Sequence, residues 1–177
     1  MPLREILTEP NEILRKKSLP VERVDGDLQQ LMNDMLDTMY AAPGIGLAAI
    51  QLGVPKRVIV LDLSSKGEPK NPMCFVNPEI LAKSENKLTY EEGCLSVPGQ
   101  FAEIDRPDKC HIKYLDYNGQ QKEIKAEGMI ATCIQHEIDH LEGILFIDYL
   151  SKLKKTMIVK KLSKQKKELE RIVVYFQ

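Results

Sequence analysis

Hydrophobic residues recur at helical spacing in three segments of the chain. Between residues 27 and 40 they lie on one face of a predicted helix, and the preceding Asp25 and Gly26 supply its N-terminal cap. The members of this face are Leu28, Leu31, Met32, Met35, Leu36 and Met39. Residues 128–141 show the same spacing, and their length favours a helix over a strand. A further amphipathic helix is predicted over residues 152–173.

Residues that favour strands lie between the first two helices. Residues 57–63 are rich in β-branched side chains and predict one strand. Residues 73–76 and 80–81 are two short candidates on either side of Asn77 and Pro78, a pair that interrupts the apolar pattern. The intervening segment of polar residues, Gly and Pro is a predicted loop.

A hairpin is predicted before the second helix. Residues 109–117 alternate between apolar and polar, Asn118 and Gly119 are typical of a tight turn, and residues 121–126 form the returning strand. Helices and strands do not alternate regularly along the chain. The pattern therefore favours an α+β fold over a doubly wound α/β fold.

The overall composition is that of an ordinary globular protein. A chain of 177 residues predicts a single domain with a real core. No run of about 20 continuous apolar residues occurs, which argues against a membrane span. The opening residues are charged and lack the apolar segment of a secretory signal. The four cysteines form no C-x-x-C pair. Because a chain of this size without a signal peptide is typical of a cytoplasmic protein, we expect a cytoplasmic location and reduced thiols.

Charge is distributed unevenly along the chain. The net charge of −1 argues against a dedicated DNA-binding protein. Residues 1–151 contain 16 Lys/Arg and 24 Asp/Glu, a net of −8, whereas residues 152–171 contain 9 and 2, a net of +7. We therefore expect residues 1–151 to form the main domain and residues 152–177 to be a basic helical extension of it, with a task of its own.

The strongest chemical signal is an H-E-x-x-H sequence in the second predicted helix. His136 and His140 lie one helical turn apart on one face, so both imidazoles can reach one cation. Glu137 lies about 100° round the helix, where it can act on water at the metal. The alternative is a pair of histidines at the surface or the edge of the core.

A catalytic metal site of this type needs a third protein ligand and an open position. The spacing of one zinc-protease class would place a third histidine where this chain has Phe146, so that class does not fit. Other sources are Glu142, Glu168, Glu170, His111 and Cys94. His111 lies in a predicted strand, and a lone cysteine is more often an inert core residue. The residues alone therefore leave the third ligand open.

Three segments taken together resemble the motifs of a known protein family. Residues 44–51 (GIGLAAIQ), 92–96 (EGCLS) and 135–143 (QHEIDHLEG) resemble, in this order, the motifs of the bacterial peptide deformylase family. The resemblance implies removal of the N-formyl group from the starting methionine of new polypeptides, with release of formate. It also implies an α+β fold in which antiparallel sheets wrap round a central metal-bearing helix, with residues 1–151 as the catalytic metallohydrolase domain.

The family pattern assigns roles to several residues. It implies one divalent metal ion on Cys94, His136 and His140, with water as fourth ligand and Glu137 as acid and base. The family's metal in the cell is usually Fe(II), and Zn, Ni or Co can substitute. The resemblance also points to the Gln51 side-chain amide and the backbone N–H of Leu95 as donors to the developing oxyanion. Without it, Gln51 is more simply a loop-capping amide.

Two further sets of residues would bind the substrate. The resemblance makes one wall of a peptide groove from Gly44, Ile45 and Gly46, and the backbones of Ile45 and Gly93 would bind an extended peptide; the simpler alternative for the glycines is a turn. Met129, Thr132 and Cys133 share the helix face of His136 and His140. With Ile45 they can line an apolar pocket for methionine, and simple core packing is the alternative.

Some positions depart from the family pattern or concern other partners. Phe101 stands where some relatives have an arginine, which removes an electrostatic contact with the substrate backbone. Arg106 is a candidate ion-pair partner for Asp139. Some family members dock a C-terminal helix near the ribosomal exit tunnel, and the basic tail could do so here. Its apolar residues are expected to face the body, namely Leu153, Met157, Ile158, Leu162 and Leu169.

Two rival functions remain to be separated from deformylation. An H-E-x-x-H endopeptidase would need a longer cleft and a third His or Glu ligand. A structural metal-binding module would need four protein ligands, and it would have no use for Gln51 or Glu137. Metal content together with hydrolysis of a formyl-Met peptide separates the three.

Overall fold

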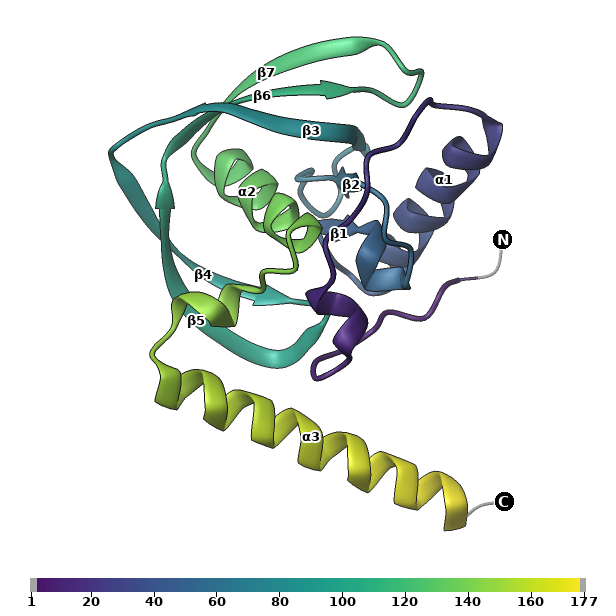
Figure 1. Ribbon diagram of the computed structural model, residues 1–177, viewed down its shortest axis with the longest axis vertical. Helices are drawn as coiled ribbons and strands as arrows, with labels where there is room; N and C mark the ends of the chain where they lie inside the picture. The colour runs from purple at the N-terminus through teal and green to yellow at the C-terminus, as the bar shows by residue number, and fades with distance from the viewer. Residues whose placement is uncertain (1–2, 176–177) are drawn as a thin grey trace.

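The computed structural model describes residues 3–175, and its centre is the helix that carries the H-E-x-x-H sequence (Figure 1). This helix, α2 (Met129–Leu141), is enclosed by strands and preceded in the chain by helix α1 (Gly26–Ala41). Helix α3 (Lys152–Tyr175) follows it and runs along the outside of the molecule. Short 3-10 turns lie at η1 (Glu12–Arg15), η2 (Ala49–Leu52) and η3 (Phe146–Tyr149).

Two antiparallel sheets surround α2. The larger has the order β1-β2-β3-β6-β7, and the smaller is the β4-β5 hairpin. Their bounds are β1 (Gly46–Ala48), β2 (Val58–Leu61), β3 (Met73–Lys83), β4 (Lys87–Cys94), β5 (Val97–Pro107), β6 (Lys109–Leu115) and β7 (Gln121–Glu127). The larger sheet lies on one side of α2 and the hairpin on the other (Figure 1). The α+β class and the central helix expected from the sequence are therefore confirmed.

Strand β2 lies between two layers of core. Ile59 and Leu61 belong to the apolar cluster on the α2 side, whereas Val58 and Val60 belong to the cluster on the α1 side. Since successive side chains point to opposite faces, a strand buried on both faces must be apolar throughout. This explains why residues 58–61 form an unbroken apolar run in the sequence.

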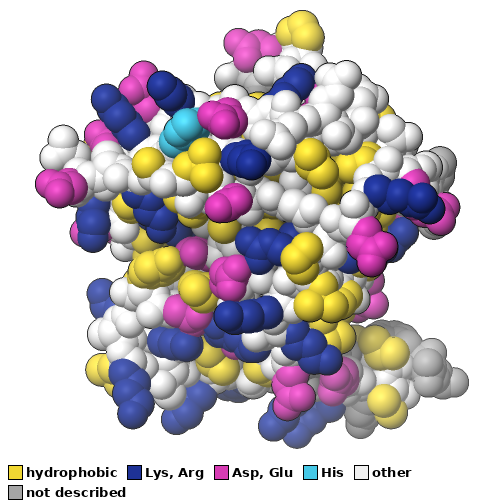
Figure 2. All heavy atoms as spheres, turned by 45° about the horizontal axis from the view of Figure 1, so that its top comes forward, with side chains coloured by type: hydrophobic (Ala, Val, Ile, Leu, Met, Phe, Trp, Pro, Cys, Tyr) yellow, Lys and Arg dark blue, Asp and Glu magenta, His cyan; other side chains and the backbone are white. Residues whose placement is uncertain are grey.

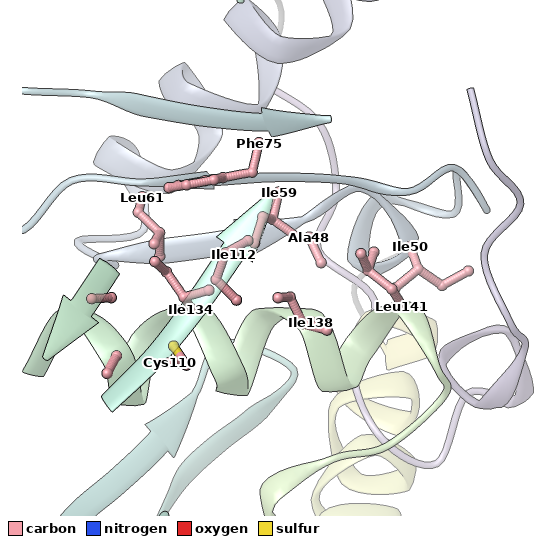
Figure 3. Close-up of a cluster of buried hydrophobic side chains, with 12 residues drawn as sticks. Ala48, Ile50, Ile59, Leu61, Phe75, Cys110, Ile112, Ile134, Ile138 and Leu141 are labelled. Carbon is pink, nitrogen blue, oxygen red and sulfur yellow. The ribbon is translucent and has the colours of Figure 1, made fainter. Parts of the chain in front are cut away.

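One face of α2 anchors it to the larger sheet. Ile134, Ile138 and Leu141 pack against the sheet, where Ile59 and Phe75 lie opposite (Figure 3). The methionines of α1 fill the second cluster, as their spacing predicts: Met32, Met35 and Met39 are fully buried. Because these apolar contacts fix one face of α2, its opposite face can carry the polar residues of the H-E-x-x-H sequence.

The strands predicted from the sequence agree with the structure except in the middle of the chain, at β3 and at the β4-β5 hairpin. Residues 73–76 and 80–81 are parts of one strand, β3, which continues through Asn77 with an irregular register. Asn77 adopts a positive φ of 50°. Its side chain accepts a hydrogen bond from the N–H of Val21 and donates another to the carbonyl of Val21. The β4-β5 hairpin was not predicted. Half of its β4 residues are exposed and only one is buried, so apolar alternation is weak there.

Helix α3 corrects one expectation about the basic tail. Ile158 and Leu162 do pack toward the body, and Leu162 is buried in the cluster around Val97 and Phe146. Leu153, Met157 and Leu169 are instead exposed to 71%, 62% and 64%. The helix touches the body mainly through β5, and within residues 3–175 the apolar cluster at this contact includes Ile158 and Leu162 but not Leu153, Met157 or Leu169. Within residues 3–175, no helix has both the length and the hydropathy needed to cross a membrane.

The end of α2 is tied to the N-terminal segment at Gly143. The N–H of Ser18 donates to the carbonyl of Leu141 at 2.8 Å, and the backbone of Arg15 passes directly against Gly143. Gly143 has a φ of +73°, a left-handed conformation that favours glycine. A methyl group there would also overlap the carbonyl of Arg15.

We therefore expect Gly143→Ala to destabilise the protein by about 2 kcal/mol or more, through backbone strain and this overlap. Urea unfolding followed by circular dichroism measures the loss. Gly26→Ala is the matched control, because a methyl group at Gly26 meets nothing within 4 Å. Its stability should stay within about 0.5 kcal/mol of the parent. Equal midpoints for the two variants would contradict this account of Gly143.

Candidate active site

Three potential metal ligands converge between α2 and the β4-β5 hairpin. His136 and His140 come from one face of α2, and Cys94 is the last residue of β4. Their ligand atoms all lie within 4.8 Å of one another, and Cys94 Sγ is 3.4 Å from His140 Nε2. The third histidine, His111, lies elsewhere and contacts Glu123 at 2.7 Å. Among the candidate ligands left open by the sequence, Cys94 is the one that the fold brings to the histidine pair.

The chemistry of the three donors fits a divalent metal ion. His140 is 1% exposed, and burial holds its pKa well below the usual value, so its imidazole is neutral and able to bind a cation. One thiol and two imidazoles make a donor set that suits Zn, Fe, Co and Ni. Three protein donors on one side leave room for a further ligand, as catalytic metal sites do.

Glu92 orients His136 from the hairpin. Its Oε1 lies 2.8 Å from His136 Nδ1, which leaves Nε2 of the ring directed toward the ligand cluster. Burial opposes the charged form of Glu92, but its hydrogen bonds with His136 and Arg106 hold its pKa below the ordinary value. Burial likewise lowers the pKa of His136, whereas its contacts with Cys94 and Glu92 raise it above the usual value overall.

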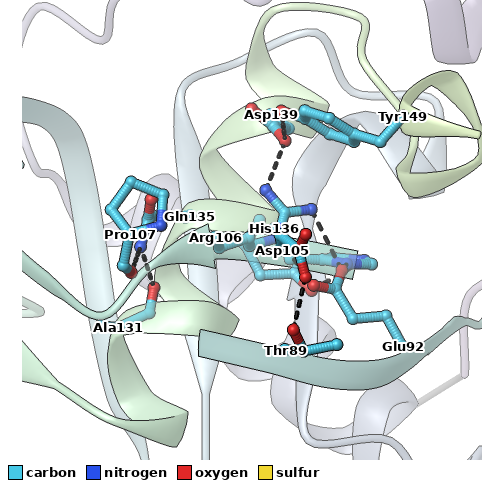
Figure 4. A network of polar contacts seen from close by, with 11 residues as sticks. Thr89, Glu92, Asp105, Arg106, Pro107, Ala131, Gln135, His136, Asp139 and Tyr149 are labelled. Carbon is cyan, nitrogen blue, oxygen red and sulfur yellow. Dashed lines mark hydrogen bonds and ion pairs between the residues drawn. The ribbon is translucent and has the colours of Figure 1, made fainter. Parts of the chain in front are cut away.

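A chain of ion pairs extends from Glu92 across the site (Figure 4). Arg106 of β5 donates to both oxygens of Glu92, at 2.7 and 3.0 Å, and to Asp139 of α2 at 2.8 Å. The Tyr149 hydroxyl donates to the same Asp139 oxygen at 2.7 Å. The predicted pairing of Asp139 with Arg106 is thus confirmed. Glu92 was not predicted, although it lies two residues before Cys94 within the EGCLS segment.

Glu137 lies beside the ligands in an almost closed position. It is 6% exposed, and its Oε2 has no hydrogen-bond partner in the part of the chain that the structure describes. Burial raises the pKa of Glu137 to about 7. A Cβ at Gly46 would come within 2.7 Å of Glu137 Oε1, so the missing side chain of Gly46 makes room for this carboxyl group.

Gln51 is held in one orientation by three contacts. Its Oε1 accepts the N–H of Ala48 at 2.9 Å, which directs its amide group toward the hairpin. Nε2 then donates to Ser96 Oγ at 2.9 Å and approaches Cys94 Sγ at 3.6 Å. Gln51 is 1% exposed. Besides capping the loop at Ala48, the amide therefore presents N–H donors beside Cys94.

A cavity of about 510 Å³ opens above these groups. Its walls come from the segment before β1, from the β4-β5 hairpin and from one face of α2 between Met129 and Glu137. All the predicted substrate-binding and catalytic residues line it: Gly44, Ile45, Gly46, Gln51, Gly93, Leu95, Met129, Thr132, Cys133 and Glu137. Cys94 and His136 also line it, whereas His140 is not among the lining residues. Such a cavity has the size of a small-ligand or peptide-end site.

Comparison with known proteins gives a consistent result. A family model for polypeptide deformylase matches residues 3–156. A peptide deformylase of Pelagibacter ubique is 64% identical over 174 residues, covering 98% of this chain and 100% of the relative. A peptide deformylase of Phenylobacterium zucineum is 59% identical, with 94% and 99% covered.

Solved structures agree with the sequence matches. The peptide deformylase of Ehrlichia chaffeensis in complex with actinonin superposes with a TM-score of 0.89 at 44% identity, covering 93% of this chain and 98% of that one. A peptide deformylase from Legionella pneumophila superposes with a TM-score of 0.88 at 48% identity, covering 96% of this chain and 99% of that one. The chain therefore belongs to the peptide deformylase family, whose members are metal-dependent enzymes that remove the N-formyl group from nascent polypeptides.

Proposed function

We propose that Cys94, His136 and His140 hold the catalytic metal ion and that Glu137 is the acid and base of deformylation. The observation that carries this assignment is the convergence of the three ligand atoms, within 4.8 Å, beside the buried carboxyl group of Glu137 at the base of one cavity. We propose Fe(II) as the metal in the cell. The donor set binds Zn, Ni and Co as well, so supply rather than raw affinity selects the occupant.

The residues around the ligands perform complementary tasks. A divalent metal bound here supplies a Lewis acid and lowers the pKa of water. Glu137 accepts a proton at its carboxyl group and delivers it to the leaving nitrogen, and a pKa of about 7 suits both transfers. The Nε2 group of Gln51 and the backbone N–H of Leu95 donate to the oxyanion that forms on the formyl oxygen.

The cavity walls accommodate the substrate. The backbones of Ile45 and Gly93 bind the peptide in extended form from its two sides, and Gly44 and Gly46 let it approach closely. The Ile45 carbonyl also accepts the N–H of Asp62 at 2.9 Å, which fixes this wall. The methionine side chain enters between Met129, Thr132 and Cys133 on α2, all of which line the cavity.

The basic tail suggests where the enzyme works. Figure 2 shows Lys and Arg side chains gathered along the lower edge of the molecule, the side on which α3 lies. Lys160, Lys164 and Lys167 are among the exposed lysines of this helix. We propose that residues 152–177 dock on ribosomal RNA, in the cytoplasm, where nascent chains emerge. Lysine contacts with phosphates give binding that weakens steeply with salt.

The central test changes Glu137 to Gln. Because this side chain is not a proposed ligand, metal content should stay at the parent level while kcat/KM for formyl-Met-Ala falls by about 100-fold or more. Formate release measures turnover, and metal analysis of the same sample checks occupancy. Glu127→Gln, an exposed glutamate of β7, is the matched control. Parent-like turnover of a fully metal-loaded Glu137→Gln enzyme would refute the assigned role.

A second test concerns the positioning of His136. We expect Glu92→Gln to weaken metal affinity by about 10-fold or more, since the amide holds the imidazole less well than the carboxylate does. Competition with a chelator measures affinity, and a circular dichroism spectrum checks that the variant is folded. Glu79→Gln, an exposed change on β3, should leave affinity unchanged. Unaltered metal affinity in folded Glu92→Gln would show that Glu92 serves the fold alone.

A third test concerns α3. Because Leu162 is part of the core, charge reversal is preferable to deletion of the whole helix. We expect Lys164→Glu, Lys166→Glu and Lys167→Glu together to reduce co-sedimentation with ribosomes by about 10-fold or more at low salt. Turnover of formyl-Met-Ala should not change. Three exposed lysines of the body, Lys66, Lys87 and Lys125, changed in the same way, provide the control. Equal co-sedimentation of both triple variants would remove the docking proposal.

A further inference from the structure

A second hollow adjoins the active-site cavity, between β5 and α3. It encloses about 630 Å³ and is lined by residues 100–103 of β5 and by residues at the start of α3, including Lys154, Met157 and Lys161. None of the residues assigned to catalysis or to methionine binding lines this hollow. We call it the α3 groove.

Phe101 joins the α3 groove to the active-site cavity. Phe101 and its neighbour Gln100 line both hollows. The Phe101 ring lies over Gly93, because a Cβ at Gly93 would come within 2.5 Å of the ring carbon Cε1. Phe101 is nevertheless 65% exposed. The two hollows therefore meet at one exposed aromatic side chain, next to the backbone that the peptide is expected to follow.

The register of the β4-β5 hairpin sets the distance between the formyl end of a bound peptide and the α3 groove. Gly93 pairs with Phe101, and Cys94 is the next residue of β4. Neighbouring strands lie about 4.8 Å apart and an extended chain advances about 3.3 Å per residue. Phe101 thus lies about 6 Å from Cys94, so a peptide whose formyl end lies beside Cys94 passes Phe101 with about its second residue, and the third and following residues enter the α3 groove.

The lining of the α3 groove combines apolar surface with positive charge. Met157 is 62% exposed and, with Phe101, offers apolar contact. Lys154 and Lys161 are exposed, and no ion pair engages either ammonium group within residues 3–175. Glu103 is the one acidic side chain among the lining residues. The groove therefore carries a net positive charge.

We propose that the α3 groove binds the third to fifth residues of the formylated peptide and favours acidic side chains there. This subsite rests on the proposed function, because the peptide must begin at the metal ligands. Its support is the continuity of the two hollows at Phe101 together with the charges of Lys154 and Lys161. The enzyme then distinguishes nascent chains by residues well beyond the methionine.

Peptide kinetics test the proposal on the metal-loaded full-length enzyme. The probes are formyl-Met-Ala-Glu-Glu, formyl-Met-Ala-Gln-Gln and formyl-Met-Ala-Lys-Lys, with formyl-Met-Ala as the reference. We expect kcat/KM for the Glu peptide to exceed that for the Lys peptide by about 3- to 10-fold at low salt, the scale of a few exposed charge pairs. The preference should shrink at about 1 M salt because of screening.

Charge reversal on α3 tests whether the lysines of the groove cause the preference for acidic peptides. Lys154→Glu with Lys161→Glu should reverse the order of the Glu and Lys peptides. Lys164→Glu with Lys167→Glu, on the same helix but outside the groove, should retain the parent order. A parent enzyme without preference, or a preference that survives the first double variant, would overturn the proposal. Failure to hydrolyse formyl-Met-Ala would instead refute the proposed function, so the two failures are distinguishable.

Cross-linking provides a test that needs no change in the groove. A formyl-Met peptide with a photoreactive phenylalanine as its fourth residue is bound to the metal-loaded Glu137→Gln enzyme and irradiated. Adducts on residues 102–103 or 150–161, found by mass spectrometry of the digest, are the expected result. Adducts confined to other parts of the chain would show that the peptide leaves the active site by another route.

Discussion

The buried ion pair between Arg106 and Glu92 is the interaction on which the site depends. Both side chains are nearly inaccessible, at 3% and 6% exposed. Taking two charges out of water is costly, and the cost is offset only by good geometry and by further hydrogen bonds. Here Arg106 bonds both oxygens of Glu92, and each partner bonds α2 as well, through Asp139 and His136. The pair thereby fixes the hairpin that carries Cys94 against the helix that carries the two histidines.

This arrangement explains why the hairpin can be polar. Val97 and Ile104 of β5 pack in an apolar cluster that includes no residue of α2, whereas directed polar groups connect the hairpin to α2. Directed contacts define orientation more strictly than apolar packing does, and orientation is what a metal site requires. The same polarity leaves backbone and side chains of the hairpin open to the cavity on one side and to the α3 groove on the other.

The sequence predicted those parts of the molecule whose burial follows a simple period. The helices α1 and α2 and the β6-β7 hairpin are confirmed because their apolar faces meet a core. The β4-β5 hairpin could not be found in this way, since only one of the eight β4 residues is buried. The histidine pair and Glu137 were visible from local spacing. The approach of Cys94 was not, because 42 residues separate it from His136 and tertiary contacts alone bring the two together. Glu92 shares this dependence on the folded hairpin.

The burial of α2 accounts for the protonation behaviour of both a proposed metal ligand, His140, and the proposed acid–base group, Glu137. Nine of its 13 residues are buried, including three ionisable ones, His136, Glu137 and His140. Burial favours the neutral form of any such group, so it lowers the pKa of an imidazole and raises that of a carboxyl group. For His140 the result is a neutral nitrogen that can bind a metal ion, and for Glu137 it is a carboxyl group that both gains and releases a proton near neutrality. One physical cause, acting in opposite directions on two residues less than a turn apart, thus prepares the ligand and the acid–base group together.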